Sequence, residues 1–403
     1  MSLRITGGQV LLAGGELAAA AIDIADGQIA AIDGSRSPAR QIDAEGLLVL
    51  PGIVDLHGDA FERQIMPRPG VLLPLDVALL DTDRQLVANG ITTALHAVTY
   101  SWEPGLRGRQ TLLDLLDSLA RLERRLACDT RLHLRWETFN LAVVDEVDGW
   151  LRAGRIQLLA FNDHFDEIRG KRDNLAAMTR YAERGRITVE EFRALLERID
   201  AGRSEVPAAI ARLAATAKAQ GIACASHDDL TAEQRHWYAG LGCAIAEFPR
   251  SEAAIGSARR LQSQIVLGAP NVLRGGSHNG GIAAAGMLDA GAGDVLASDY
   301  YYPAPLQAAW RLWREGLMSL PQAWALVAGN PARAAGLDDR GEITSGKRAD
   351  IILVDASNEA LPQVVAVLVA GVLVHSANGF TARAPEPGFL KPPAPAHPRA
   401  AAC

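Results

Sequence analysis

Eight short apolar runs alternate with amphipathic helical patterns between residues 53 and 301 of this chain. Such an alternation is typical of repeated βα units, whose strands form a parallel sheet. Eight strands over about 250 residues favour a closed (β/α)₈ barrel over an open doubly wound sheet, and no G-x-G-x-x-G motif follows the first run. The runs are Ile53–Asp59, Thr92–Val98, Arg131–Glu137, Ile156–Asp163, Ala223–Asp229, Ala244–Pro249, Ile265–Pro270 and Val295–Tyr301.

The segments on either side of the repeat contain short strands separated by turns. We expect residues 1–50 and 340–380 to pair into one small discontinuous β-sandwich domain beside a barrel of residues 51–339. The Pro-rich segment 384–403 is expected to be extended or disordered. The expected strands are Leu3–Ile5, Val10–Leu12, Ala21–Ile24, Gln28–Ile32, Leu47–Leu50, Ile351–Val354 and one long strand, Val364–Val374.

Composition excludes several classes of function. With 49% hydrophobic and 22% charged residues, the 403-residue chain has the composition of a globular protein. A net charge of −7 argues against a general nucleic-acid surface, and no apolar run approaches the ~20 residues of a membrane span. The N-terminus has no signal-peptide pattern, so we expect a cytoplasmic protein; its oligomeric state, a homo-oligomer included, stays open. Four cysteines without C-x-x-C spacing argue against a thiolate metal site.

Polar side chains gather at the ends of five of the eight expected strands, where the loops of a barrel converge on one mouth. His57 and Asp59 are two residues apart on the first strand, so both point to the same side of it. The other candidates are Glu137 on the third strand, His164 after the fourth, His227 on the fifth and Asp299 after the eighth. Each alone is more often a structural residue, but together they favour a metal site.

This set of three imidazoles and three carboxylates suits one or two divalent ions, with Zn²⁺ first and Mn²⁺ or Fe²⁺ as alternatives. A divalent ion activates water as a nucleophile at neutral pH. Asp299 is the candidate general base, and the geometry decides whether it lies near that water.

Several motifs of the chain resemble the amidohydrolase superfamily and, within it, the α-D-ribose 1-methylphosphonate 5-triphosphate diphosphatase family of phosphonate metabolism. The resemblance runs from about residue 48 to 350 and implies the six ligands above, with Glu137 where many relatives place a carboxylated lysine. The segments that carry it are Val49–His57, His57-x-Asp59, Pro67–Pro69, Asn89–Thr93, Arg131–Glu137, Asp163–His164, Ala225–Asp229, Ile245–Pro249, Gly268–Asn271, Arg274–His278, Ser298–Tyr301 and Gly346–Asp350.

The resemblance implies hydrolysis of a phosphorylated small molecule, a ribose 5-triphosphate, to the 5-phosphate and pyrophosphate. Arginine and glycine-rich backbone suit phosphate oxygens. The candidates for these contacts are Arg68, Arg274, Gly275, Gly276, Ser277 and His278. A solvated loop is the alternative for Arg68 and the glycines, and His278 could instead act as an acid.

Three further features weigh on this interpretation. The basic cluster Arg169, Lys171 and Arg172 is read as a solvated face, and His96 as a packed core histidine. The run Ala60–Gln64, after the first strand, departs from the pattern we associate with the family and puts its substrate contacts in doubt.

Two other functions compete with phosphoanhydride cleavage. The same fold and metals could hydrolyse a C–N bond in a cyclic amide or an N-acyl group, in which case turnover would not depend on Arg274. A non-catalytic scaffold is the third reading, and it predicts that the protein binds no metal.

Overall fold

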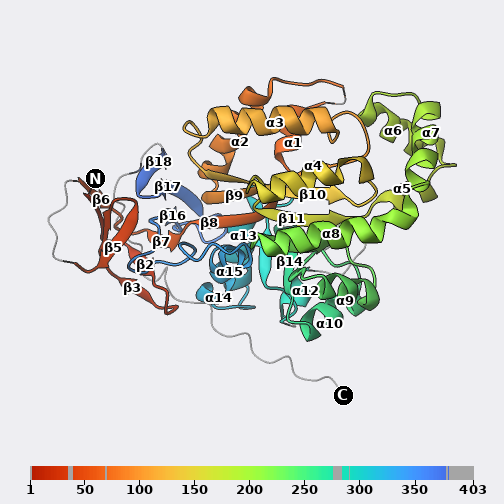
Figure 1. Cartoon of the computed structure of the whole chain (residues 1–403). Helices are drawn as coiled ribbons and strands as arrows, with labels where there is room; N and C mark the ends of the chain where they lie inside the picture. Colours follow the sequence, from red (N-terminus) through yellow and green to blue (C-terminus); the bar gives the residue numbers. More distant parts are fainter. Residues whose placement is uncertain are drawn as a thin grey trace, which may run out of the picture.

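The computed structural model describes residues 2–34, 40–68, 70–275, 284–289, 291–377 and 380. Its central feature is an eight-stranded parallel sheet in which each strand pairs with the next along the chain (Figure 1). Parallel pairing between Gly58 and Asp299 brings the last strand back to the first. The expected (β/α)₈ barrel is therefore confirmed. The strands are β8 (Ile53–Gly58), β9 (Ile91–Tyr100), β10 (Asp129–Glu137), β11 (Leu158–Asn162), β12 (Ala223–His227), β13 (Ile245–Glu247), β14 (Gln264–Gly268) and β15 (Val295–Ala297).

The inside of the barrel is filled by small and branched aliphatic side chains, as close packing of a closed sheet requires. Three strands also contribute buried polar side chains: His57 from β8, His133 and Arg135 from β10, and Glu247 from β13. The barrel therefore contains buried polar groups in addition to those at its mouth. The aliphatic cluster consists of Leu56, Leu95, Leu158, Ala160, Ala225, Ile245, Val266, Val295 and Ala297.

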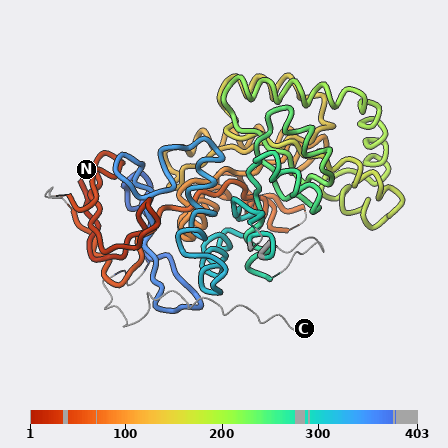
Figure 2. The backbone as a smooth tube through the Cα atoms, turned by 90° about the horizontal axis from the view of Figure 1, so that it is seen from below, coloured from red at the N-terminus to blue at the C-terminus, as the bar shows by residue number. Residues whose placement is uncertain are grey.

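Helices follow the strands and cover the outside of the barrel (Figure 1). Three of them, α5, α6 and α7, project at the end of the molecule opposite to the N-terminal strands (Figure 2). Among the described residues, none of the helices has the length and apolarity to cross a bilayer. The helices are α1 (Phe61–Ile65), α2 (Leu75–Ala88), α3 (Arg109–Leu122), α4 (Val144–Arg152), α5 (Phe165–Gly170), α6 (Leu175–Gly185), α7 (Val189–Asp200), α8 (Val206–Ala219), α9 (Ala232–Gly240), α10 (Glu252–Arg260), α11 (Ala269–Arg274), α12 (Ala284–Asp289), α13 (Ala304–Arg314), α14 (Leu320–Ala325) and α15 (Gly329–Ala334).

Both ends of the chain contribute to a small β unit beside the barrel (Figures 1 and 2). One sheet has the order β5-β4-β1-β6, and the other has the order β18-β17-β16-β7-β2-β3. In the second sheet β16 pairs with β7, so residues far apart in sequence share one core, as expected. The strands are β1 (Ser2–Thr6), β2 (Gln9–Leu11), β3 (Leu17–Ala19), β4 (Ile22–Ala25), β5 (Gln28–Ile32), β6 (Arg40–Asp43), β7 (Leu48–Pro51), β16 (Ile351–Asp355), β17 (Gln363–Val369) and β18 (Val372–Ser376).

The expectation of one long strand over Val364–Val374 is wrong. The chain reverses between β17 and β18, which pair antiparallel with each other. Ala370 and Gly371 have φ values of 46° and 72°, and two consecutive left-handed residues make the tight turn of a hairpin. The apolar run hid this turn, because alanine is uncommon in that conformation. The expected strands also did not include β3 and β6.

A buried ion-pair cluster joins the barrel to the segment that leads into the small β unit. Asp129, at the start of β10, accepts hydrogen bonds from Arg340 at 2.6 Å and Arg348 at 2.7 Å. Burial alone would raise the pKa of Asp129, but hydrogen bonds from Arg131 and Arg340 outweigh it and hold the pKa at about 2. Asp129 therefore ties β10 to the returning chain as a carboxylate.

We expect Asp129→Asn to lower the free energy of unfolding at pH 7 by about 2 kcal/mol. A pKa that folding lowers by roughly two units contributes about that much to the stability of the folded state. The contribution is complete above the unfolded-state pKa of about 3.9 and is lost as the pH falls through 2. Urea unfolding at pH 7 and pH 3 should show the difference between variant and parent shrinking at the lower pH. Asp339→Asn, which alters a more exposed carboxylate beside the same Arg340, is the matched control; an equal loss in both variants would contradict the prediction.

Candidate active site at the barrel mouth

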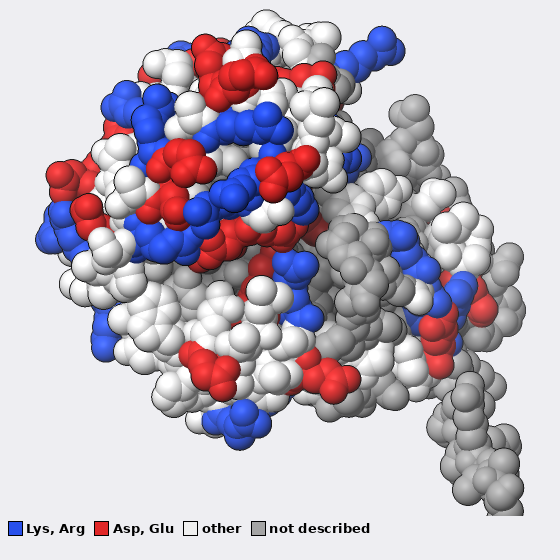
Figure 3. All heavy atoms as spheres, turned by 90° about the vertical axis from the view of Figure 1, so that its right-hand side faces the viewer, with Lys and Arg blue, Asp and Glu red and all other residues white. Residues whose placement is uncertain are grey.

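The carboxyl ends of the barrel strands carry the polar residues that the sequence indicated. Figure 3 views the molecule from the side of α5, α6 and α7, where acidic and basic side chains alternate over the upper part and the face is hollowed below them. The basic residues that follow His164 are partly exposed. Arg169 pairs with Asp200 at 3.0 Å and Lys171 with Glu167 at 2.8 Å, so this cluster has acidic partners.

His164, His227 and Asp228 form one compact group at this end, which we call the mouth group. A single carboxylate oxygen of Asp228, Oδ2, lies 3.5 Å from His164 Nε2 and 3.5 Å from His227 Nδ1. All three ligand atoms lie within 4.8 Å of one another. His227 Nδ1 is buried and has no hydrogen-bond partner within the described chain. The geometry and the orphaned nitrogen fit a divalent cation with nitrogen and oxygen ligands.

Asp228 reaches this group because of its backbone conformation. Alternation along β12 would direct residue 228 to the opposite side from His227. Its φ of 60° is left-handed, and its backbone N–H donates to the carbonyl of Glu247 at 2.9 Å. Burial would raise the pKa of the Asp228 carboxyl, but His227 and His164 outweigh that effect and lower it. Asp228 is therefore an ionised ligand candidate that the sequence prediction left out.

Glu137 lies behind the mouth group. Its Oε1 is 2.6 Å from His164 Nδ1, and its Oε2 accepts from the His164 backbone N–H at 3.3 Å. Burial would raise the pKa of Glu137, but the charge of His164 lowers it more; conversely, Glu137 helps to raise the pKa of His164 to about 9 against its burial. A carboxylate on the far nitrogen of an imidazole fixes its tautomer and its orientation.

Asp59 faces an arginine that the sequence prediction did not assign to the site. Arg135 Nη1 lies 3.2 Å from Asp59 Oδ2, and Arg135 Nη2 lies 3.4 Å from His227 Nε2. Burial raises the pKa of Asp59 and Arg135 opposes that rise. Arg135 points to the same side of β10 as Glu137, two residues on, so strand alternation was the signal that could have found it. The guanidinium brings a fixed positive charge to the mouth.

Asp299 is held at the mouth by its backbone. Its N–H donates to the carbonyl of His57 at 2.9 Å, and its own carbonyl accepts from the N–H of Asp59 at 2.9 Å. The preceding Ser298 is fixed by Asp55, whose carboxylate accepts from the Ser298 hydroxyl at 2.5 Å. Burial, followed by the charge of Asp59, raises the pKa of Asp299 to about 7. A carboxylate with such a pKa can accept or release a proton near neutrality.

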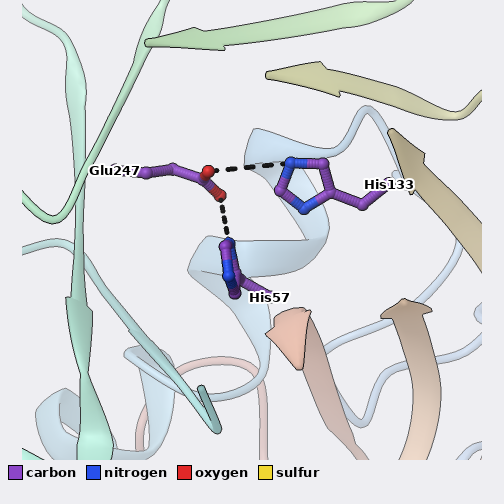
Figure 4. A group of neighbouring side chains, drawn as sticks. All are labelled: His57, His133 and Glu247. Atoms are coloured by element: carbon purple, nitrogen blue, oxygen red, sulfur yellow. Dashed lines mark hydrogen bonds and ion pairs between the residues drawn. The ribbon is translucent and has the colours of Figure 1, made fainter. Parts of the chain in front are cut away.

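His57 belongs to a second group, which lies deeper and which we call the interior group. Its members are His57, His133 and Glu247, from β8, β10 and β13, and their side chains converge inside the barrel (Figure 4). His57 Nδ1 is 3.2 Å from Glu247 Oε1, and His133 Nε2 is 3.6 Å from Glu247 Oε2. The sequence prediction placed His57 beside Asp59 and assigned no role to His133 or Glu247.

The predicted phosphate contacts are placed only in part. Arg68 and Arg274 are both exposed, and Gly275 ends α11 with a φ of 78°. Gly276, Ser277 and His278 lie outside the described residues. His96 is buried against Phe61, with ring centroids 5.0 Å apart, in agreement with a packed core histidine.

The departing run Ala60–Gln64 lies largely in α1, directly after Asp59. Glu62 accepts two hydrogen bonds from Arg107, at 3.0 and 2.9 Å. Arg63 donates to the carbonyl of Tyr300, the neighbour of Asp299. This helix therefore holds Arg107 through Glu62 and places Arg63 beside the residue that follows the predicted base.

Comparison with known proteins agrees with the family resemblance of the sequence motifs. A sequence model described as the amidohydrolase family matches residues 150–375. The alpha-D-ribose 1-methylphosphonate 5-triphosphate diphosphatase of Escherichia coli (strain K12) is 34% identical over 355 residues, which are 84% of this chain and 91% of that protein.

Solved structures resemble the chain in fold. A triazine hydrolase variant has a TM-score of 0.63 at 15% identity, covering 93% of this chain and 95% of that one. Dihydropyrimidinase from Brevibacillus agri has a TM-score of 0.55 at 16% identity over the same shares. At these identities, the likeness supports the barrel with its added β unit.

Proposed function

Because the chain belongs to the amidohydrolase family, a family of metal-dependent hydrolases, we propose that it cleaves α-D-ribose 1-methylphosphonate 5-triphosphate to the 5-phosphate and pyrophosphate. The observation that carries this proposal is the similarity to the Escherichia coli diphosphatase, which extends over most of both chains. The mouth group supports it independently, because its donors suit the divalent ion that such a hydrolysis uses.

The mouth group is the proposed holder of a catalytic divalent ion, with Zn²⁺ first and Mn²⁺ or Fe²⁺ as alternatives for the same donors. When bound, such an ion supplies Lewis-acid activation of water and neutralisation of phosphate charge. His164, His227 and Asp228 would hold it, and Glu137 would keep the His164 ring in place through the 2.6 Å contact. Asp59 stays a predicted ligand, with Arg135 as its present partner.

The reaction breaks the bond between the α-phosphorus and the oxygen that bridges it to the β-phosphorus. The oxygen of water joins the α-phosphorus, and pyrophosphate leaves with the bridging oxygen. Asp299 is proposed to take the proton of that water, since its raised pKa suits a base near neutrality. Arg135, whose buried charge is already in place beside Asp59 and His227, is proposed to face the phosphate chain. Arg68 and Arg274 are proposed to contact the outer phosphates from their exposed loops.

Glu137→Gln is expected to weaken metal binding at the mouth by about 10- to 100-fold, the usual effect of losing a carboxylate behind a ligating histidine. The variant keeps the size of the side chain and removes its charge. Competition with a coloured chelator measures the affinity. Glu146→Gln, which removes the charge from an ion pair with Arg109, is the control, and equal affinities in both variants would contradict the role given to Glu137.

The test of function is pyrophosphate release by the purified, metal-replete protein. The ribose 5-triphosphate substrate is expected to yield one pyrophosphate and one 5-phosphate, and Arg274→Ala to raise its KM. The alternative is hydrolysis of a C–N bond. It would be supported if the protein released no pyrophosphate from this substrate or from nucleoside triphosphates, and hydrolysed hydantoins, dihydroorotate or N-acyl sugars independently of Arg274. A protein that binds no metal after metal-supplemented growth would be a scaffold.

A further inference from the structure

A pocket of about 640 Å³, which we call the side pocket, lies between the loop that follows β9 and the helix α7. Segment 100–110 forms one wall, and Glu191, Ala194, Leu195 and Arg198 of α7 form the other. Their spacing of three or four residues puts them on one face of the helix. The described residues that line the side pocket include no member of the mouth group and none of the six predicted ligands. Pockets of roughly 300–1,000 Å³ accommodate small organic molecules, so the side pocket is large enough for a ligand of its own.

The side pocket presents more apolar than polar surface. Trp102 lines it and packs against Phe165, with ring centroids 5.6 Å apart, so neighbouring rings hold the indole in place. The indole Nε1 has no hydrogen-bond partner within the described chain, which leaves an unused donor on this residue. Val143 and Leu195 contribute further apolar surface. An aromatic body suits these walls, because rings gain energy from contact with other rings as well as from leaving water.

The two acidic residues of the side pocket already have partners. The carboxylate of Glu103 accepts hydrogen bonds from Arg184 at 2.6 and 2.7 Å. The carboxylate of Glu191 accepts from the backbone N–H of Thr188 at 2.8 Å, as part of the capping box that begins α7. Among the described residues, the side pocket therefore offers no unpartnered acid to a cationic ligand.

One of the two arginines of the side pocket has no acidic partner. Arg109 donates to Glu146 at 2.6 and 3.1 Å. Arg198, in the last turn of α7, is exposed and makes no hydrogen bond or ion pair with any described residue. A guanidinium carries a planar set of donors that matches carboxylate and phosphate oxygens. The side pocket therefore combines apolar walls with one unpaired positive charge.

We propose that the side pocket binds a small organic anion, whose aromatic body packs against Trp102 and Leu195 and whose carboxylate, sulfonate or phosphate group pairs with Arg198. This site goes beyond the proposed function and does not rest on it. A ribose triphosphate is a poor match, because its chain carries several negative charges and a single arginine would leave most of them unpaired. A ligand with one charged group fits better, since its charge meets Arg198 while its apolar part leaves water.

The experiment compares two fluorescent probes that differ in charge. Anilinonaphthalene sulfonate is an aromatic anion, and N-phenylnaphthylamine is a neutral molecule of similar shape. Each is titrated into the metal-loaded full-length protein, and we expect the anion to bind saturably. Ala194→Trp should abolish this binding, because the new indole fills the side pocket. Arg198→Glu should weaken binding of the anion by at least about fivefold and leave binding of the neutral probe within about twofold.

The matched control is Arg193→Glu, which makes the same change of charge on α7. Arg193 donates to the carbonyl of Arg172 and does not line the side pocket, so this variant should bind both probes like the parent protein. Saturable binding that is unchanged in Ala194→Trp would overturn the proposal, as would a parent protein that binds no anion.

Equal effects of Arg198→Glu and Arg193→Glu on the anion would also overturn the proposal, because the net charge of the protein would then explain both. If Ala194→Trp does not fold, these two variants decide, since both change exposed residues. No substrate enters these titrations. A failure of pyrophosphate release would therefore reject the proposed reaction and leave the result for the side pocket untouched.

Discussion

His227→Asn is expected to lower the rate of pyrophosphate release by about a thousandfold or more. His227 contributes its buried Nδ1 to the mouth group and lies 3.4 Å from Arg135 through Nε2. A divalent ion supplies several kcal/mol of charge stabilisation in hydrolysis, and about 4 kcal/mol corresponds to a factor of roughly 10³. Steady-state assays with fixed Zn²⁺ measure the loss, and added Zn²⁺ should restore part of the rate because the affinity of the site has fallen.

The control for this variant is His236→Asn, on the exposed side of α9. Its rate and its Zn²⁺ content should equal those of the parent protein. A His227→Asn enzyme that keeps a rate within tenfold of the parent, at limiting Zn²⁺, would remove the mouth group from the catalytic machinery. In that case the six ligands inferred from resemblance, with His57 and Asp59 among them, would become the better description of the site.

The barrel could be predicted from the sequence because most of its strands are short, mainly apolar runs that alternate with helical patterns. His57, Glu137 and His227, which end expected runs in the sequence, also lie at or next to the ends of the observed strands β8, β10 and β12. What alternation cannot supply is the distance across the barrel. Glu247 lies on β13, a strand of three residues, and only closure of the sheet brings it within 3.2 Å of His57.

Backbone conformation is the second reason why the site differs from its prediction. Asp228 and Asp299 have φ values of 60° and 53°, and aspartate is among the few residues that tolerate this left-handed region. At residue 228 this turn brings a side chain to the mouth that regular alternation would direct away. The local sequence after His227 contains two aspartates, and alternation favours Asp229, which instead accepts from the hydroxyl of Ser226 at 2.6 Å.

The polar side chains inside the barrel are the third reason why the site could not be fully predicted from the sequence. His133 and Arg135 lie on the inward face of β10, where a sequence pattern predicts aliphatic packing. Their roles differ because their neighbours differ: Arg135 meets Asp59 and His227 at the mouth, while His133 meets Glu247 below it. These neighbours belong to strands that are far away in sequence, so the partner of each side chain appears only in the folded barrel.

Asp299→Asn is expected to lower kcat by about 10²- to 10⁴-fold, the usual contribution of a positioned general base. Asparagine keeps the shape of the side chain, and the two backbone hydrogen bonds of residue 299 to the segment 57–59 do not depend on the carboxylate. The loss should therefore fall on kcat and leave KM within a few-fold. Single-turnover measurement with saturating Zn²⁺ separates this chemical step from binding and product release.

The pH profile gives this prediction a second readout. Asp299 accepts a proton only when ionised, so the parent rate should fall as the pH drops through the pKa of this carboxyl, which is about 7 without bound metal. A nearby cation lowers that pKa, so the acid limb is expected below pH 7 in the loaded enzyme and absent from the Asn variant. Asp83→Asn alters another buried carboxyl with a raised pKa, on α2, and should change stability without changing kcat. An acid limb that persists in Asp299→Asn would assign the proton to a different group. Burial also raises the pKa of Asp59, so Asp59 would then be the first residue to replace.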